Sequence, residues 1–278
     1  IYQESRQGGR QNNEARGALR LDGNAKLLGN VSLTGTTSFG SSSGTGTIAG
    51  PVSGAFAFQQ AATSPGTVCL SGDNSFSGGS IVSNGTVQAG HNHAFGSGTL
   101  TLSGGILSSD STAARTLPNA CVISGPVTLG STVNSGRLSF AGTVSFSGNQ
   151  TLTTDSDVAF SSINGGGQLN HAGNGALTLG GSFTAMNSSA GLGGSIGLGA
   201  PGLTIDTKNF NITIPASFEG SGGLTKTGSG ILTLNGASTA TGTVLVSAGT
   251  LRLSPSTLLP AGLEIMPLGD SITYGYGG

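Results

Sequence analysis

The sequence predicts an all-β protein whose chain winds into a parallel β-helix, a stack of coils also called a β-solenoid. Two observations carry this prediction: a seven-residue frame, Gly-x-(Leu/Val)-x-(Leu/Phe)-x-Gly, recurs along the chain, and 52 of the 278 residues are glycine. Each frame encodes a short strand with two apolar residues on one face. Such a strand cannot bury that face alone, so the copies must stack on one another. The frames begin at Gly17, Gly29, Gly66, Gly98, Gly136, Gly142, Gly175 and Gly230.

The repeat is longer than the frame, because residues 66–89 and 230–253 align without a gap at an offset of 164. Each copy reads as a strand, a glycine turn, a second strand, another glycine turn and a third strand. We therefore expect each copy to form three short faces of a coil. At roughly 20–25 residues per coil, the range 17–258 would hold about ten to twelve coils. In the downstream copy the side chains expected to point inward are Leu232, Leu234, Val244, Val246, Leu251 and Leu253.

The composition favours this ordered solenoid over a disordered Gly/Ser/Thr-rich chain. Disordered segments combine few aliphatic residues with high net charge, whereas this chain has a formal charge of −1 and keeps its aliphatic residues in register between the glycines. Residues 1–16 are predicted to be a polar cap or linker at the N-terminus. Arginines there suggest nucleic-acid contact as an alternative, but Glu4 and Glu14 are interleaved with them and no aromatic platform accompanies them. We expect no nucleic-acid partner.

No apolar run in the chain is long enough to cross a bilayer as a helix, so we expect no membrane-spanning segment. The chain begins at Ile1 without a secretory signal pattern, and any export signal is therefore expected to lie upstream. Cys69 and Cys121 are too few for a disulfide framework. Cys69 occupies the slot of Thr233 in the repeat and is expected to point outward, so a bridge between the two cysteines is disfavoured.

The glycine-framed block from Gly222 to Gly236, followed by Gly242-Thr-Val-Leu-Val-Ser-Ala-Gly-Thr-Leu-Arg-Leu253, resembles the autotransporter-associated β-strand repeat. The copy at 66–89 matches this pattern fairly, and the rest of 17–221 is degenerate. The resemblance implies a right-handed β-helix in a secreted or cell-surface bacterial protein. It does not imply a ligand.

The frame stops after Pro260, and the stretch Pro267-Leu-Gly-Asp-Ser-Ile-Thr-Tyr-Gly275 is of another kind. A serine at a sharp strand-to-helix turn presents its hydroxyl above a sheet edge. The stretch resembles the first motif of the SGNH (GDSL-type) hydrolases, especially their carbohydrate esterases. By that resemblance residues 259–278 are the truncated start of an α/β SGNH domain. Ser271 would be the nucleophile and an oxyanion-hole donor, with Gly269 and Asp270 as its motif context.

The later motifs of that family, which supply an Asp-x-x-His pair and further oxyanion donors, do not occur in this sequence. A serine without a base is a weak nucleophile, so this chain is predicted to be inactive as an esterase. The expectation is that it is a fragment, and that the parent protein joins a secreted β-helix to an SGNH esterase.

Two further groups of polar residues are candidate sites. His91-Asn92-His93 places two imidazoles together, but zinc prefers four ligands and the nearest acids, Asp73 and Asp110, are remote in sequence. Polar turn residues are the favoured interpretation there, as they are for His171, so no metal and no cofactor are predicted. Asp155 and Asp157 would share one face of a strand, as paired acids of a glycan-cleaving β-helix would. A solvated strand edge is the favoured interpretation of that pair.

The sequence thus predicts an extracellular or cell-surface β-helix that displays or spaces an appended hydrolase, as a monomeric rod. The alternative is a β-helix with its own glycan-binding or glycan-cleaving site. Outward threonines such as Thr99, Thr101, Thr178 and Thr233 suit a solvated strand face and could also bind carbohydrate weakly. Carbohydrate or another cell-surface polymer is the expected partner.

Overall fold

The computed structural model describes residues 18–61, 65–254 and 265–267, and these contain strands and turns but no helix. The chain divides into two compact units, residues 1–138 (unit 1) and 139–278 (unit 2), each treated separately. Six successive strands of one sheet in unit 1 mark six coils, and the two units together hold about 12. The predicted all-β parallel solenoid of about ten to twelve coils is confirmed, while its handedness stays a prediction.

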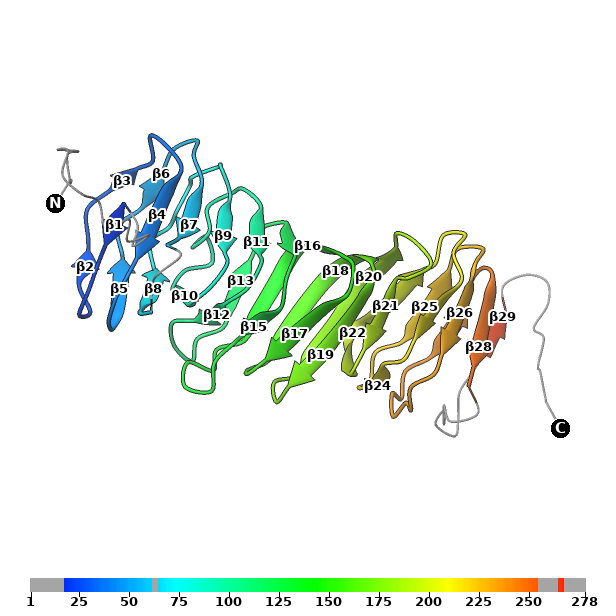
Figure 1. The fold of residues 1–278 in the computed structure, drawn as a ribbon. Helices are drawn as coiled ribbons and strands as arrows, with labels where there is room; N and C mark the ends of the chain where they lie inside the picture. The colour runs from blue at the N-terminus through cyan, green and yellow to red at the C-terminus, as the bar shows by residue number, and fades with distance from the viewer. Residues whose placement is uncertain (1–17, 62–64, 255–264, 268–278) are drawn as a thin grey trace. The chain divides into compact units, whose positions relative to one another are not determined.

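Unit 1 is a stack of short parallel strands (Figure 1, blue to green). One sheet has the order β1-β4-β7-β9-β11-β14, a second has the order β2-β5-β8-β10-β12-β15, and β3 pairs with β6. The strands are β1 (Leu19–Arg20), β2 (Lys26–Leu27), β3 (Val31–Ser32), β4 (Thr37–Gly40), β5 (Thr45–Ile48), β6 (Val52–Ser53), β7 (Phe58–Gln60), β8 (Thr67–Leu70), β9 (Ser80–Val82), β10 (Thr86–Ala89), β11 (Leu100–Leu102), β12 (Ile106–Ser109), β13 (Arg115–Leu117), β14 (Cys121–Ile123) and β15 (Val127–Leu129).

The frame residues form the core of unit 1, because each inward side chain stacks on its equivalent in the next coil. Val68 lies opposite Val87, and Val87 lies opposite Leu107. All three are at most 2% exposed. The spacing of these partners along the chain gives the length of one coil, about 20 residues, at the short end of the range known for solenoid repeats.

The repeat copy at 66–89 covers more than one coil, which corrects the expectation of three faces of a single coil. Its first and third strands, β8 and β10, are neighbouring rungs of the same sheet, while its second strand, β9, belongs to the other sheet. The third strand therefore begins the next coil. The strand–turn–strand–turn–strand order itself is confirmed.

Cys69 takes the outward position on its strand that was predicted, but solvent does not reach it. It alternates with the inward Val68 and Leu70, yet it is only 4% exposed. Thr47 and Gln88 lie on either side of it in register, and this cover buries a small side chain on the outer face. Both Cys69 and Cys121 are free and buried.

Unit 2 has longer strands. The sheet order is β16-β18-β20-β22-β25-β27-β29 with β24 beside β22, a second group is β17-β19-β21, and a third sheet is β23-β26-β28. The strands are β16 (Leu138–Ser147, whose first residue closes unit 1), β17 (Gln150–Thr154), β18 (Val158–Gly166), β19 (Gln168–Gly173), β20 (Leu177–Ala185), β21 (Gly191–Gly193), β22 (Ser195–Asp206), β23 (Ile212–Ile214), β24 (Ser217–Glu219), β25 (Leu224–Thr227), β26 (Ile231–Leu234), β27 (Val244–Val246), β28 (Thr250–Leu253) and β29 (Ile265–Pro267).

The long strands of unit 2 run through a corner instead of stopping at it. The pairing of β20 with β22 shifts register between Leu179 and Gly181. Gly181 has a φ of 88°, and a Cβ there would collide with the carbonyl oxygen of Ser161. A glycine is needed at this bulge both for the positive φ and for the close approach of the next coil.

The downstream repeat copy lies at the end of the described stack. Leu232 and Leu234 are at most 3% exposed, and Val244 is 7% exposed, as predicted. Val246 and Leu251 are only half-buried, and Leu253 is 37% exposed, in contrast to the inward burial predicted for them. Among the described residues β28 pairs with β26 on one side only, so its apolar side chains lack a second neighbour.

Only residues 265–267 of the predicted start of an α/β domain are described, and that assignment stays a prediction. Ile265–Pro267 forms β29, which pairs in parallel with β27 and continues the solenoid sheet. No α/β domain is seen in the part of the chain that the structure describes.

Candidate functional site

The residues His91, Asn92 and His93 lie in the connection between β10 and β11, in a tight turn as predicted. The Ala94 amide donates to the carbonyl oxygen of His91 at 3.1 Å, and the Gly96 amide donates to that of His93 at 3.0 Å. In addition the His93 amide donates to Nδ1 of His91 at 3.1 Å. The turn thus fixes both its backbone and one of its imidazoles.

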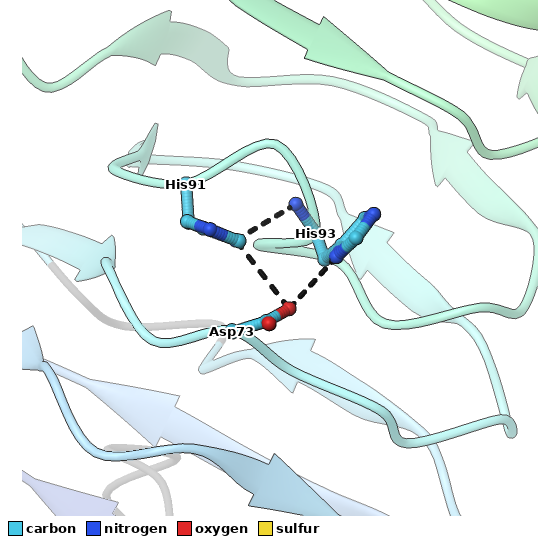
Figure 2. A group of neighbouring side chains, drawn as sticks. All are labelled: Asp73, His91 and His93. Atoms are coloured by element: carbon cyan, nitrogen blue, oxygen red, sulfur yellow. Dashed lines mark hydrogen bonds and ion pairs between the residues drawn. The ribbon is translucent and has the colours of Figure 1, made fainter.

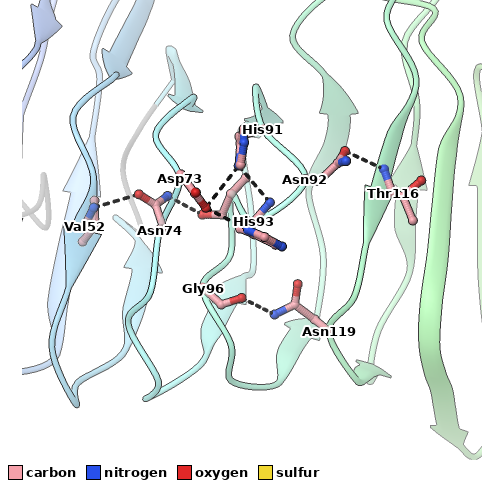
Figure 3. Close-up of polar contacts among 10 residues, drawn as sticks. Val52, Asp73, Asn74, His91, Asn92, His93, Gly96, Thr116 and Asn119 are labelled. Atoms are coloured by element: carbon pink, nitrogen blue, oxygen red, sulfur yellow. Dashed lines mark hydrogen bonds and ion pairs between the residues drawn. The ribbon is translucent and has the colours of Figure 1, made fainter.

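Asparagine side chains tie this turn to the coils on both sides (Figure 3). Nδ2 of Asn74, one coil earlier, donates to the carbonyl oxygen of Ala94 at 2.7 Å. Oδ1 of Asn92 accepts a hydrogen bond from the amide of Thr116, one coil later, at 2.9 Å. Asn74 is only 4% exposed and also accepts from the amide of Val52 at 2.8 Å. The turn is therefore held by hydrogen bonds from both neighbouring coils.

Asp73 lies directly against the two imidazoles, although it is remote from them in sequence (Figure 2). Its Oδ1 is 2.7 Å from Nδ1 of His93 and 3.6 Å from Nδ1 of His91. One ligand atom from each of the three residues lies within 4.8 Å of the others. The sequence alone separates this acid from the histidines, but it precedes them by about one coil, and the stacking of coils brings the three residues together.

The carboxylate of Asp73 is electrostatically favoured at this position. The hydrogen bond from His93 lowers the pKa of Asp73 below its usual value, and the charges of His91 and His93 act in the same direction, against a smaller opposing effect of burial. The side chains remain accessible, with exposed fractions of 70% for Asp73, 39% for His91 and 53% for His93. The three groups can therefore be reached from solvent.

A cavity of about 430 Å³ adjoins the cluster and is lined by Asp73, Asn74 and His93 together with Ser97, Pro118 and Asn119. Asn119 is 3% exposed. Its Nδ2 donates to the carbonyl oxygens of Gly96 and Gly98 at 3.1 and 2.7 Å. Its Oδ1 is buried without a hydrogen-bond partner among the described residues. This oxygen is itself out of contact with solvent.

Two other candidate sites from the sequence do not form as expected. Asp155 and Asp157 lie in the corner between β17 and β18 and not on a strand. Oδ1 of Asp157 accepts from the Ala176 amide at 3.2 Å, so it stabilises that corner. His171 lies on β19 and not in a turn. Its Nδ1 is 2.7 Å from the carbonyl oxygen of Ser195, and its Nε2 is 2.8 Å from Oγ1 of Thr154.

Lys226 is a buried charged residue that sequence reasoning missed. It lies between Ile205 and Val246 in register and is 0% exposed. Its Nζ donates to Oγ1 of Thr207 and to the carbonyl oxygens of Thr227, Gly228 and Ala248 at 2.7 to 3.0 Å. Burial lowers its pKa, and the carboxylate of Asp206 opposes that change. The alternation of β25 places it inward, and this signal was available in the sequence.

The residues of the predicted esterase motif, Gly269, Asp270 and Ser271, lie outside the described residues. Their roles remain a prediction. Within the described ranges, no helix is long and apolar enough to cross a membrane.

Comparison with known proteins shows which family of repeats these two copies resemble. The family model of the passenger-associated-transport-repeat matches residues 62–89 and 224–253, the two copies found in the sequence. A stretch of 67 residues is 40% identical to the adhesin BmaC autotransporter of Brucella suis biovar 1 (strain 1330), covering 24% of this chain and 2% of that protein. No solved structure matches the chain. These matches indicate a secreted or cell-surface protein, as predicted from the sequence.

Proposed function

We propose that this chain is part of an autotransporter-type passenger and serves as a surface display and adhesion module. The match of its two repeat copies to the passenger-associated-transport-repeat carries the proposal. The 67-residue stretch shared with an adhesin supports an adhesive role over a purely passive one. The chain spans a small part of that relative's length, so the activity of the whole protein belongs to the proposal.

The physical character of the stack suits this role. Each coil pairs with its neighbours through parallel backbone ladders and closely stacked aliphatic residues, so the stack extends without needing a separate core. The outward strand positions are mainly small and polar, and only 21 of the 278 residues are charged. An extended neutral face of this kind suits weak, repeated contacts with a polymer such as a glycan.

Adhesion is tested with beads coated with the full 278-residue chain and passed over immobilised polysaccharides and cultured host cells. We expect retention by the native chain and loss of retention for Val87→Asp, in which a charge enters the core of unit 1. Beads coated with Thr101→Ser serve as the folded control. Equal retention of native and Val87→Asp beads, or none of either, would contradict an adhesive role for the folded solenoid.

A second candidate function is the esterase, which only the motif Gly269-Asp270-Ser271 favours. The repeat match ends at residue 253 and does not extend to this motif. In the longest natural form of the protein we expect hydrolysis of acetylated carbohydrate that Ser271→Ala abolishes, because loss of a catalytic nucleophile leaves only residual activity. Activity that survives Ser271→Ala would contradict the resemblance.

A further inference from the structure

We propose that Asp73, His91 and His93 bind a divalent transition-metal ion of the Zn²⁺ class at the corner between two coils. Two imidazoles and one carboxylate are a common three-residue ligand set for zinc in proteins. Imidazole ligands disfavour Ca²⁺ and Mg²⁺, which prefer oxygen donors only. The site would keep a fourth position open to water or to a donor group of a bound molecule.

The distances are close to those that a metal requires. Metal–nitrogen and metal–oxygen bonds of about 2.0–2.2 Å in a tetrahedron place ligand atoms roughly 3.4 Å apart. Here Oδ1 of Asp73 is 2.7 Å from Nδ1 of His93 and 3.6 Å from Nδ1 of His91. Since the three side chains are on the surface, small rotations about their side-chain bonds can correct the remaining differences.

The donor types also fit. Metal ligands are ionised carboxylates and neutral imidazoles, and Asp73 with His91 and His93 supplies one carboxylate and two imidazoles in contact with one another. Nδ1 of His91 carries one lone pair, which accepts a hydrogen bond from the His93 amide, so a metal bound at that nitrogen would take the place of this hydrogen bond. The Nδ1 proton that His93 shares with Asp73 must leave when the metal binds at that nitrogen. A neutral ring does this by carrying its proton on Nε2, so binding at Nδ1 changes the tautomer of His93.

The surroundings hold the ligands in position. Asn74 and Asn92 fix the turn from the two neighbouring coils, so little ordering of the backbone is needed on binding. Asn119, which lines the same cavity, fixes the stretch after the turn through its hydrogen bonds to the carbonyl oxygens of Gly96 and Gly98.

The alternative interpretation is that Asp73 and His93 form a surface ion pair and nothing more. Such a pair is present in many proteins and contributes little to stability. It does not account for the second imidazole within reach of the same carboxylate.

The test is isothermal titration of the full chain with ZnCl₂ in a non-chelating buffer at pH 7.5, followed by Co²⁺ substitution read by visible absorption. We expect one ion per chain and a tetrahedral Co²⁺ spectrum. His91→Gln, His93→Gln and Asp73→Asn should each weaken binding by at least about tenfold. Binding should weaken as the pH falls, because protons compete with the metal for the ligand atoms.

Two control variants carry the same chemical changes away from the cluster. His171→Gln removes the third histidine and Glu219→Gln removes an exposed carboxylate, and both should leave the affinity for Zn²⁺ unchanged. Circular dichroism checks that each variant remains folded. Absence of binding at millimolar Zn²⁺, or binding that survives His91→Gln combined with His93→Gln, would overturn the proposal. Equal binding of Ca²⁺ would overturn the assigned class of metal.

Discussion

The two copies of the repeat have one pattern but different surroundings. In the copy at 66–89, Val87 lies between Val68 and Leu107 in neighbouring rungs and is fully buried. Its counterpart in the copy at 230–253, Leu251, lies opposite Leu232 on one side only and is half-buried. Burial differs more strongly at the last position of the repeat, where Ala89 is 0% exposed and its counterpart Leu253 is 37% exposed.

This difference shows that burial in a solenoid is set by the neighbouring coil and not by the repeat itself. An apolar side chain of the frame contributes its full stabilisation only when coils cover it from both sides. The same substitution should therefore cost very different amounts in the two copies. Matched variants can test this directly, with the loss of β-sheet circular dichroism in urea as the measurement.

The largest effect is expected for Val87→Asp compared with Leu251→Asp. Burying an unpaired carboxylate between two coils should lower the free energy of unfolding by about 4 kcal/mol or more. At position 251 the charge can reach solvent, and a loss of about 1 kcal/mol is expected. Equal losses would mean that β28 is covered as fully as β10.

The next largest effect is expected for Lys226→Met. The change removes the donor for four oxygen atoms that are grouped inside unit 2. Acceptors left without partners should lower the free energy of unfolding by about 3 kcal/mol. Lys208, which is 56% exposed and pairs with Asp206 at 2.7 Å, is the control, and Lys208→Met should cost below about 1 kcal/mol. If Lys226→Met left the free energy of unfolding unchanged, apolar packing of the methionine would have made up for the lost hydrogen bonds, which would contradict the prediction.

A smaller difference is expected between Asn74 and its counterpart Ser238. Asn74 bonds to the backbone of both neighbouring coils, at Val52 and Ala94. Asn74→Ala should therefore cost about 2 kcal/mol. Oγ of Ser238 donates to the carbonyl oxygen of Phe218 on one side, so Ser238→Ala should cost below about 1 kcal/mol. A larger loss at Ser238 would contradict the one-sided environment of the downstream copy.

The smallest effect on stability is expected from the ionisation of the two buried thiols, Cys69 and Cys121. Burial raises the pKa of Cys69 to about 11 and that of Cys121 to about 12. Native chain should therefore resist iodoacetamide at pH 8, and urea should expose both thiols to it. In the unfolded chain the thiols return to their ordinary pKa of 9.0. The free energy of unfolding that their burial as neutral thiols contributes is therefore fully present below pH 9, and it is lost as the pH rises toward about 12. Rapid labelling of the native chain would contradict their burial.

The sequence predicted strand positions and inward faces well, because the frame fixes both through glycine spacing and alternation. Leu100 and Leu102, for example, follow Gly98 and are both 0% exposed. It could not predict which residues meet across coils, because coil length varies by a few residues. The approach of Asp73 to His91 and His93 depends on that length and was missed.

Other departures have local causes. Asp155 and Asp157 were placed on a strand, but β17 ends at Thr154 and they turn the corner. His171 follows Asn170 in a sequence typical of a turn, yet pairing with neighbouring coils makes it part of β19. Lys226 shows that polar atoms at a corner can favour a charged side chain where the pattern predicts an aliphatic one.

The parallel ladders within each unit also determine how a coil would respond to force. Successive rungs are joined by backbone hydrogen bonds between neighbouring coils, and an end strand such as β28 has a described partner on one side only. Tension along the stacking direction would open these bonds one coil at a time, from the end inward. Each coil of about 20 residues would then release about 70 Å of chain. A tethered cell would be restrained by a series of small yielding steps and not by a single abrupt rupture.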